Sequence, residues 1–192
     1  FAGYGVDVSD FRSTQNLAQQ IHLDGRQIDI LVNNAGITRD ASLRKLDKAD
    51  WDVVLRTNLD SMFNVTKLFI EPMMGRRWGR IVNISSINGS KGQFGQTNYS
   101  AAKAGVHGFT KALAQEVARA GVTVNTVSLG YLATEMLTTM REDVLARIIE
   151  TIPVGRLGQP DEIAALVAFI ASEEAAFMTG SNIAMNGGQH MC

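Results

Sequence analysis

The stretch that decides the fold runs from Arg80 to Val127 and places a long amphipathic segment between two short apolar ones. The first short segment is Arg80-Ile-Val-Asn-Ile-Ser85 and the last is Val122-Thr-Val-Asn-Thr-Val127. Both are rich in β-branched residues, which predicts buried strands. Between Asn98 and Ala120 the apolar positions step by three or four residues, as on one face of a helix, and Gly121 stands where a glycine commonly ends one. A strand, a helix and a second strand in this order predict parallel pairing in a layered α/β sheet.

The same alternation continues on both sides of this stretch. Upstream, Ile28 to Val32 predicts a strand and Lys48 to about Met74 predicts a long helix. Downstream, a proline followed by two acidic residues begins a helix from Pro160 to Ser172, and Asn182 to Met185 predicts the last strand. Ligands bind outside the carboxyl ends of the strands in such sheets. The segments to search are therefore residues 33–40, 85–96 and 128–136.

Length and composition exclude several classes of protein. The 192 residues suit one domain with a full core, and 45% of them are hydrophobic. A net charge of −1 gives no electrostatic case for nucleic acid or a membrane surface as a partner, and no apolar run reaches the roughly 18 residues of a spanning helix. The single cysteine, Cys192, forms no intrachain disulfide, and the scattered His22, His107 and His190 predict no metal site. The chain begins with Phe1, so any targeting segment would precede it.

Tyr99 and Lys103 lie four residues apart in the predicted helix and therefore share a face. An ammonium near a phenol stabilises the phenolate, so we expect Lys103 to lower the pKa of Tyr99 and fit it to protonate a ketone oxygen. Ser86 follows a buried strand and can polarise the same carbonyl by a hydrogen bond. An ordinary helix-surface pair and a turn serine are the alternatives.

Asn58 lies inside an otherwise apolar helix, where a buried amide needs hydrogen-bond partners. Two interpretations fit it. Asn58 either holds a water that passes protons to Lys103, or it is a structural asparagine whose hydrogen bonds are satisfied within the protein.

In order and spacing, the chain resembles the short-chain dehydrogenase/reductase family. The elements that carry the resemblance are Asn33-Asn-Ala-Gly36 after a strand, Asn58, Ser86, and Tyr99 with Lys103, and it covers essentially the whole chain. It implies a Rossmann-type doubly wound parallel sheet and the reduction of a ketone with a nicotinamide cofactor. It further implies that Asn58, Ser86, Tyr99 and Lys103 form the catalytic tetrad.

The resemblance also implies which residues bind the cofactor. Asp7 and Val8, after the first strand, would lie beside the adenine, and the segment Asn34, Ala35, Gly36 and Ile37 would pack its backbone on the adenosine side. Gly130, Leu132 and Thr134 would contact the nicotinamide carboxamide, while Tyr99 and Lys103 complete the set at the nicotinamide ribose. NADPH is expected on the resemblance alone, and NADH is the alternative.

The chain departs from the family pattern in two places. Leu129-Gly130 stands where members usually have Pro-Gly, and the loss of proline is expected to loosen that turn. The Gly-rich turn and helix N-terminus that hold the cofactor's pyrophosphate are absent from the sequence. We therefore expect residues 1–192 to be the C-terminal three-quarters of a single domain that lacks its first two strands. We also expect these residues alone to be inactive.

Within the family, the resemblance is to reductases of 3-oxoacyl thioesters, and it implies acetoacetyl-CoA as the substrate, for polyhydroxybutyrate synthesis. The residues expected at the substrate are Asp40, Gln93, Phe94, Gln96, Tyr131 and Arg141. Phe94 can pack on an acyl or pantetheine chain, the glutamines can hydrogen-bond a thioester or amide, and Arg141 can meet a CoA phosphate. A generic polar loop and a solvated arginine are the alternatives.

Two other functions remain open. A 3-oxoacyl-carrier-protein reductase of fatty-acid synthesis would need a basic docking patch, which Arg39, Arg44, Lys45 and Lys48 can form. A catalytically silent binding or scaffold relative is the other, although such a protein has no need of Tyr99 and Lys103 together. The resemblance also implies a homotetramer built on the two long helices, and a cytoplasmic location.

Overall fold

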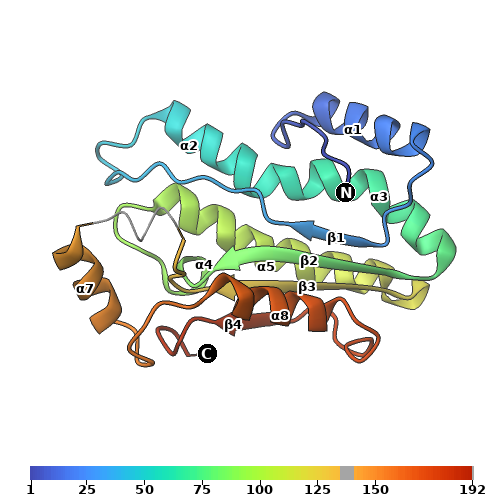
Figure 1. The fold of residues 1–192 in the computed structure, drawn as a ribbon. Helices are drawn as coiled ribbons and strands as arrows, with labels where there is room; N and C mark the ends of the chain where they lie inside the picture. Colours follow the sequence, from blue (N-terminus) through green and yellow to red (C-terminus); the bar gives the residue numbers. More distant parts are fainter. Residues whose placement is uncertain (135–140, 192) are drawn as a thin grey trace.

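Four parallel strands form the centre of the fold (Figure 1). The computed structural model describes residues 1–134 and 141–191. In this part of the chain the sheet order is β1-β2-β3-β4, where the strands are β1 (Ile30–Asn33), β2 (Gly79–Ser86), β3 (Val122–Leu129) and β4 (Asn182–Met185). Neighbouring strands pair in register, with Val32 beside Val82 and Val82 beside Asn125. The predicted α/β class and parallel pairing are confirmed.

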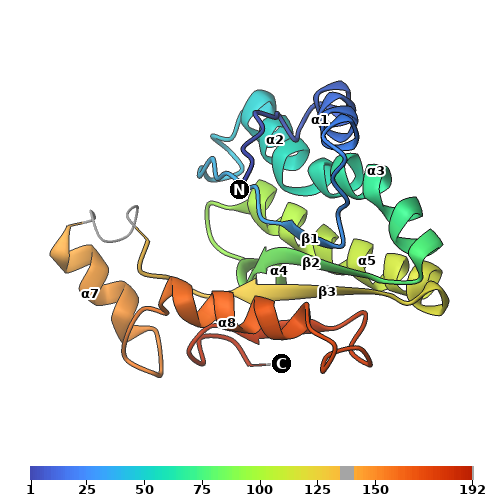
Figure 2. The ribbon, with the colours of Figure 1, turned by 45° about the vertical axis from the view of Figure 1, so that its right-hand side comes forward.

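Helices connect the strands and cover both faces of the sheet. They are α1 (Phe11–Leu23), α2 (Lys48–Leu55), the π-helical turn η1 (Arg56–Asp60), α3 (Ser61–Arg76), α4 (Asn88–Lys91), α5 (Thr97–Val117), the 3₁₀ turn η2 (Ala118–Ala120), α7 (Glu142–Glu150) and α8 (Pro160–Ile170). Figure 2 shows α1 and α3 on one side of the sheet and α8 on the other.

Alternate residues of the strands supply two separate cores. On one face Ile81 packs with Phe69 and Met73 of α3 and with Val117 of α5. On the other face Val82 and Ile84 pack with Ile170 of α8. Because successive side chains of a strand point to opposite faces, the near-continuous apolar run of β2 fills both cores.

The long predicted helix over residues 48–74 consists of three pieces in one line. α2 passes through η1 into α3, which continues beyond Pro72 to Arg76. Arg77 ends it in the left-handed region with φ of 56°. A Cβ on Gly121, which follows η2, would lie 2.2 Å from the Arg77 carbonyl oxygen, so the two chain reversals touch backbone to backbone.

Three helices and one strand differ from the prediction. α1, α4 and α7 were not predicted, and no strand precedes Asp7, since residues 1–7 form no regular element. A strand is defined by hydrogen bonds to a neighbour, and no strand lies beside residues 1–7 in the described structure. The expected first strand was therefore wrong for this structure.

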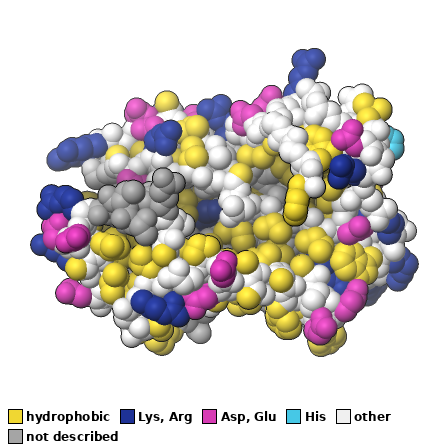
Figure 3. Space-filling view, viewed as in Figure 1, with side chains coloured by type: hydrophobic (Ala, Val, Ile, Leu, Met, Phe, Trp, Pro, Cys, Tyr) yellow, Lys and Arg dark blue, Asp and Glu magenta, His cyan; other side chains and the backbone are white. Residues whose placement is uncertain are grey.

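β1 forms an edge of the sheet in the described part of the chain. Its side chains alternate, so that Leu31 joins the core beneath α3 while Ile30 and Val32 remain 47% and 42% exposed. Hydrophobic side chains gather across the middle of the face of the molecule that Figure 3 shows. A strand that lacks a neighbour on one side is expected to leave such side chains exposed.

Candidate active site

Ser86, Tyr99 and Lys103 come together at the carboxyl edge of the sheet. Ser86 is the last residue of β2, and Tyr99 and Lys103 lie in the first two turns of α5, which packs on β2 and β3. A Cβ on Gly89 would lie 2.7 Å from the carbonyl carbon of Lys103, so the single turn of α4 sits directly against α5. The glycine lets the segment after β2 approach the helix closely enough to bring Ser86 to Tyr99.

A buried asparagine holds the start of α5. The side chain of Asn98 is fully buried, its Nδ2 donates to the Arg39 carbonyl at 3.0 Å, and its Oδ1 accepts from the Tyr99 backbone N–H at 2.8 Å. Asn98 therefore fixes Tyr99 against the segment that follows β1. The sequence analysis missed this residue, because its partner lies 59 positions away in the sequence.

The Tyr99 phenol is not activated in the expected direction. Burial raises the pKa of Tyr99 above its ordinary value, the Ser86 hydroxyl opposes this rise, and the Asp40 carboxylate adds to it. The predicted lowering by Lys103 is wrong for this structure. The Lys103 Nζ lies 5.6 Å from the centre of the Tyr99 ring, and its hydrogen bond goes to the Ile84 carbonyl.

Lys103 is buried and bound to the backbone. Its side chain is 3% exposed, and its Nζ donates to the Ile84 carbonyl of β2 at 2.8 Å. Burial lowers the pKa of Lys103 from 10.5 to about 8, because removing an ammonium from water disfavours the charged form. The lysine can thus change its protonation state near neutral pH.

Asn58 lies in the π-helical turn and has its hydrogen bonds satisfied within the protein. Its Nδ2 donates to the carbonyls of Ile37 and Val54, both at 2.9 Å, and its Oδ1 accepts from the Ile37 N–H at 3.3 Å. A Cβ on Gly36 would lie 2.7 Å from that oxygen and 3.6 Å from the Lys103 Nζ. The structural interpretation of Asn58 therefore holds for its side chain, which anchors the segment after β1 over Lys103.

The residues expected on the adenosine side of the cofactor lie in two segments, one after β1 and one before α1. Asn34, Ala35 and Gly36 are exposed directly after β1. The Val8 carbonyl accepts from Asn64 Nδ2 at 2.9 Å, which ties the segment of Asp7 and Val8 to α3. The Asp7 carboxylate accepts hydrogen bonds from Ser9, which lower its pKa.

The segment after β3 lies against the last strand. The Gly130 N–H donates to the Met185 carbonyl, and a Cβ on Gly130 would lie 2.7 Å from the Asn186 Cα. Leu129, which stands in place of the proline, continues β3 in register with Met185 and packs in the core under α8. Leu132 forms a bridge to Gly158, and Thr134 closes the described part of this segment, so Met136 lies outside the described residues.

The expected substrate residues divide into four groups. Asp40 accepts from Gln96 Nε2 at 2.8 Å, and Gln96 in turn accepts from Asn88, which links the loops after β1 and β2. Gln93 and Tyr131 line one cavity. Phe94 stands alone as the third group and is 90% exposed.

Arg141 forms the fourth group, apart from the others. Its guanidinium donates twice to Asp143, at 3.0 and 2.7 Å, in an exposed pair at the start of α7. The partner of Arg141 in the described structure is thus this carboxylate.

A second residue that the sequence analysis assigned to no site lies beneath Lys103. His107 Nε2 is 2.9 Å from Ser85 Oγ and 3.2 Å from Ser128 Oγ. The two hydroxyls donate to the Lys103 carbonyl and to Asn182 Oδ1 respectively. Each hydroxyl hydrogen is thereby used, so His107 Nε2 must carry the proton and donate to both serines.

Two features are absent from the described residues 1–134 and 141–191. They contain no group of three or more side chains suited to a metal ion. None of their helices is both long and apolar enough to cross a bilayer.

Comparison with known proteins places this chain in a family. Residues 2–190 match the family described as Enoyl-(Acyl carrier protein) reductase. An acetoacetyl-CoA reductase of Cupriavidus necator is 60% identical over 185 residues, which are 96% of this chain and 75% of the relative. Nodulation protein G of Azospirillum brasilense is 57% identical over 95% of this chain and 74% of its own length. A 3-oxoacyl-[acyl-carrier-protein] reductase of Haemophilus influenzae is 47% identical, over 98% of this chain and 78% of the relative.

Three observations agree with one another. They are the parallel α/β fold, the arrangement of Ser86, Tyr99 and Lys103 at the carboxyl edge of the sheet, and a family match that spans nearly all residues. The chain belongs to the short-chain dehydrogenase/reductase family.

Proposed function

We propose that this protein reduces acetoacetyl-CoA to 3-hydroxybutyryl-CoA. The observation that carries the proposal is the convergence of the Tyr99 phenol, the Ser86 hydroxyl and the buried Lys103 ammonium at one edge of the sheet. Relatives named acetoacetyl-CoA reductase support the choice of substrate, since they are 52–60% identical, whereas those named for the carrier-protein substrate are 46–47% identical.

The proposed chemistry is proton donation to a ketone oxygen. The Tyr99 phenol and the Ser86 hydroxyl hydrogen-bond the oxygen, and Tyr99 gives it a proton as negative charge develops there. A phenol whose pKa is raised keeps its proton at neutral pH and so remains a donor. Lys103, with its pKa near 8, can return a proton to Tyr99 afterwards. Asn58 contributes by holding Gly36 and Ile37 over Lys103.

A nicotinamide cofactor, which we propose to be NADPH, supplies the hydride when it is bound. The residues of this chain suit the adenosine side and the nicotinamide end of that cofactor. The exposed backbone at Asn34, Ala35 and Gly36, where a side chain at Gly36 would strike Asn58, suits a flat group lying close to the chain. Asp7 and Val8 would border the adenine, and Gly130, Leu132, Thr134, Tyr99 and Lys103 the nicotinamide end.

We also propose that residues 1–192 belong to a single Rossmann-type domain. The matched relatives are longer, since this chain covers 75% of the Cupriavidus necator protein. We call the chain preceded by the amino-terminal quarter of that relative the extended protein. Assembly as a homotetramer and a cytoplasmic location are part of the same proposal, through the resemblance to the family.

The substrate is proposed to lie against Asp40, Gln93, Phe94, Gln96 and Tyr131. The hydrogen bond between Asp40 and Gln96 keeps their loops together at the entrance to Tyr99. The exposed Phe94 offers an apolar surface to an acyl or pantetheine chain. Reduction of a carrier-protein thioester is the second candidate, because Arg39, Arg44, Lys45 and Lys48 are exposed and basic beside this entrance.

The test is steady-state reduction of acetoacetyl-CoA by the extended protein and its Tyr99→Phe variant. We expect Tyr99→Phe to lose at least about a hundredfold in kcat, because the proton donor is gone, with cofactor affinity nearly unchanged. Single-turnover reduction within about tenfold of the parent would refute the assignment of Tyr99. A higher kcat/KM for acetoacetyl carrier protein than for acetoacetyl-CoA would select the second candidate.

A further inference from the structure

A cavity of about 340 Å³ opens between the end of α4 and α7. Its lining includes Lys91, Gln93, Tyr131, Arg147, Ile148 and Thr151. Two of these, Gln93 and Tyr131, are residues already proposed at the substrate. The cavity therefore continues the proposed substrate entrance outward between two helices.

Two cations from different helices stand at this cavity. Lys91 is the last residue of α4, and its Nζ donates to Gln93 Oε1 at 3.1 Å. Arg147 is exposed on α7 and forms no ion pair with any described residue, in contrast to Arg141, which is paired with Asp143. None of the described lining residues is acidic. The positive charge of Lys91 and Arg147 is therefore available to an anion.

The rest of the lining suits a chain of amides and methylene groups. The Gln93 amide and the Thr151 hydroxyl offer donors and acceptors, while Ile148 and Tyr131 offer apolar surface. A ligand that fits has an amide-bearing arm leading toward Tyr99 and an anionic end at the two cations. The arm of an acyl thioester carrier, 4′-phosphopantetheine, has this composition.

Resting on the proposed function, we propose that Lys91 and Arg147 bind the phosphate of the substrate's 4′-phosphopantetheine arm. A guanidinium can meet a phosphate with two parallel hydrogen bonds, and an ammonium contributes a point charge. CoA and acyl carrier protein both carry this phosphate, so the site recognises what the two substrates share. Arg141, expected earlier at a CoA phosphate, is assigned no part in it.

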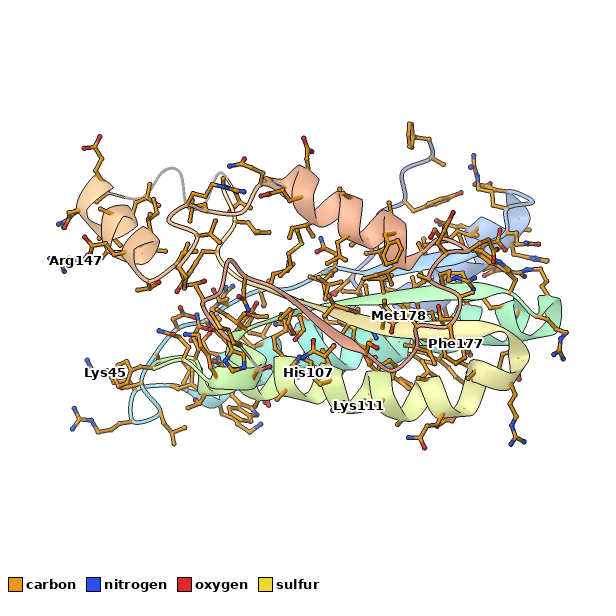
Figure 4. The ribbon with its side chains drawn as sticks, turned by 90° about the horizontal axis from the view of Figure 1, so that it is seen from below. Lys45, His107, Lys111, Arg147, Phe177 and Met178 are labelled. Carbon is orange, nitrogen blue, oxygen red and sulfur yellow. The ribbon has the colours of Figure 1, made fainter. Side chains whose placement is uncertain are left out.

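The experiment compares three thioesters on the extended protein: acetoacetyl-CoA, acetoacetyl-pantetheine, which lacks the phosphate, and acetoacetyl carrier protein. The variants are Lys91→Met, Arg147→Met and the double variant, with Arg147→Lys as the conservative change. Lys111→Met is the matched control, because Lys111 is exposed on α5, away from the end of the molecule where Arg147 lies (Figure 4). Removing one charge-assisted contact at an exposed site typically costs about fivefold to tenfold in affinity.

We expect the KM for acetoacetyl-CoA and for the carrier-protein thioester to rise by about that factor in each single variant, and further in the double variant. The KM for acetoacetyl-pantetheine should rise much less, and Arg147→Lys should recover part of the loss. Equal losses on all three thioesters would overturn the proposal, since the cations would then act on the structure of the entrance. A loss confined to acetoacetyl-CoA would also overturn it, since the anion recognised would be one that CoA alone carries.

If the parent reduces none of the thioesters, the proposed function is wrong. The phosphate site at Lys91 and Arg147 is then tested by calorimetric titration with CoA. Binding by the parent that is weakened at least about fivefold in the double variant but not in Lys111→Met supports the phosphate site. Equal binding by all three proteins, or none by the parent, refutes it.

Discussion

At the scale of single residues, Lys103 has the most consequential environment in the molecule. Its ammonium is buried with one backbone acceptor, the Ile84 carbonyl, and its pKa falls from 10.5 to about 8. At pH below 8 the lysine is charged in both the folded and the unfolded protein, and the full cost of burying the charge applies. Between pH 8 and 10.5 the unfolded protein binds more protons, so the free energy of unfolding rises with pH.

We predict that this rise in the free energy of unfolding with pH depends on Lys103. Between pH 7.5 and 9.5 the free energy of unfolding of the extended protein should rise, relative to that of Lys103→Met, by about 2 kcal/mol. Urea unfolding at the two pH values measures the difference, with Lys111→Met as a control that follows the parent. An equal difference between parent and Lys103→Met at both pH values would show that the pKa of Lys103 is not lowered.

That Ser86, Tyr99 and Lys103 come together could be predicted because their types and spacing are local signals. Tyr99 and Lys103 are four residues apart on one helix, and Ser86 directly ends a strand. Asn98 and His107 were not assigned to the site, because their roles depend on partners distant in the sequence. The direction of the Tyr99 pKa was wrong for a related reason: adjacency on a helix face does not reveal that the Lys103 ammonium turns to the Ile84 carbonyl.

At the scale of elements, one histidine joins a helix to three strands. His107 on α5 donates to Ser85 of β2 and Ser128 of β3, and Ser128 continues to Asn182 of β4 (Figure 4 labels His107). Burial lowers the pKa of His107, and the nearby Lys111 and Lys103 lower it further, so the ring is neutral at pH 7. The network therefore fixes the position and the orientation of α5, and with it Lys103, relative to the sheet.

We predict that His107→Leu destabilises the extended protein by about 1–3 kcal/mol, since both serine hydroxyls lose a donor in a buried site. His107→Gln should be milder, because its amide can still donate from a similar position. Urea unfolding of the three proteins, together with kcat for acetoacetyl-CoA, measures the effect. If leucine and glutamine cost the same, the donated hydrogen bonds are not what His107 contributes.

The predictions of helices and strands were confirmed where the sequence pattern was long or buried, and were wrong where it was short. β2, β3 and α5 were predicted to within a few residues, because a strand of this sheet is apolar on both faces and the helix has a continuous stripe. The single turn of α4 is too short for any periodicity, although its Gly89 proves decisive for the site. The π-helical turn at Asn58 has no sequence signal of its own; such turns often occur at functional sites.

At the scale of the whole molecule, the described sheet is open at β1. Ile30 and Val32 lie on the sheet face that α8 covers only in part, and the backbone edge of β1 has no neighbouring strand among the described residues. An apolar edge strand with unpaired N–H and C=O groups is a template for pairing with another chain.

We predict that the 192-residue chain expressed alone self-associates through β1. Sedimentation velocity at several concentrations should show species that grow with concentration, and Val32→Lys should suppress them, because a charge on an edge strand opposes pairing. The extended protein should show a fixed assembly at the same concentrations. A concentration-independent monomer of the 192-residue chain would contradict this use of the edge.

The contact between Arg77 and Gly121 has a consequence for how sequence variation in this protein is read. Any side chain at 121 would occupy the space of the Arg77 carbonyl oxygen, and the backbone there already has φ of 75°. This junction lies at the amino ends of β2 and β3, at the opposite end of these strands from Ser86. A mutational scan scored by growth would mark Gly121 as intolerant as Tyr99, and only a parallel scan of protein abundance would tell the lost fold from the lost chemistry.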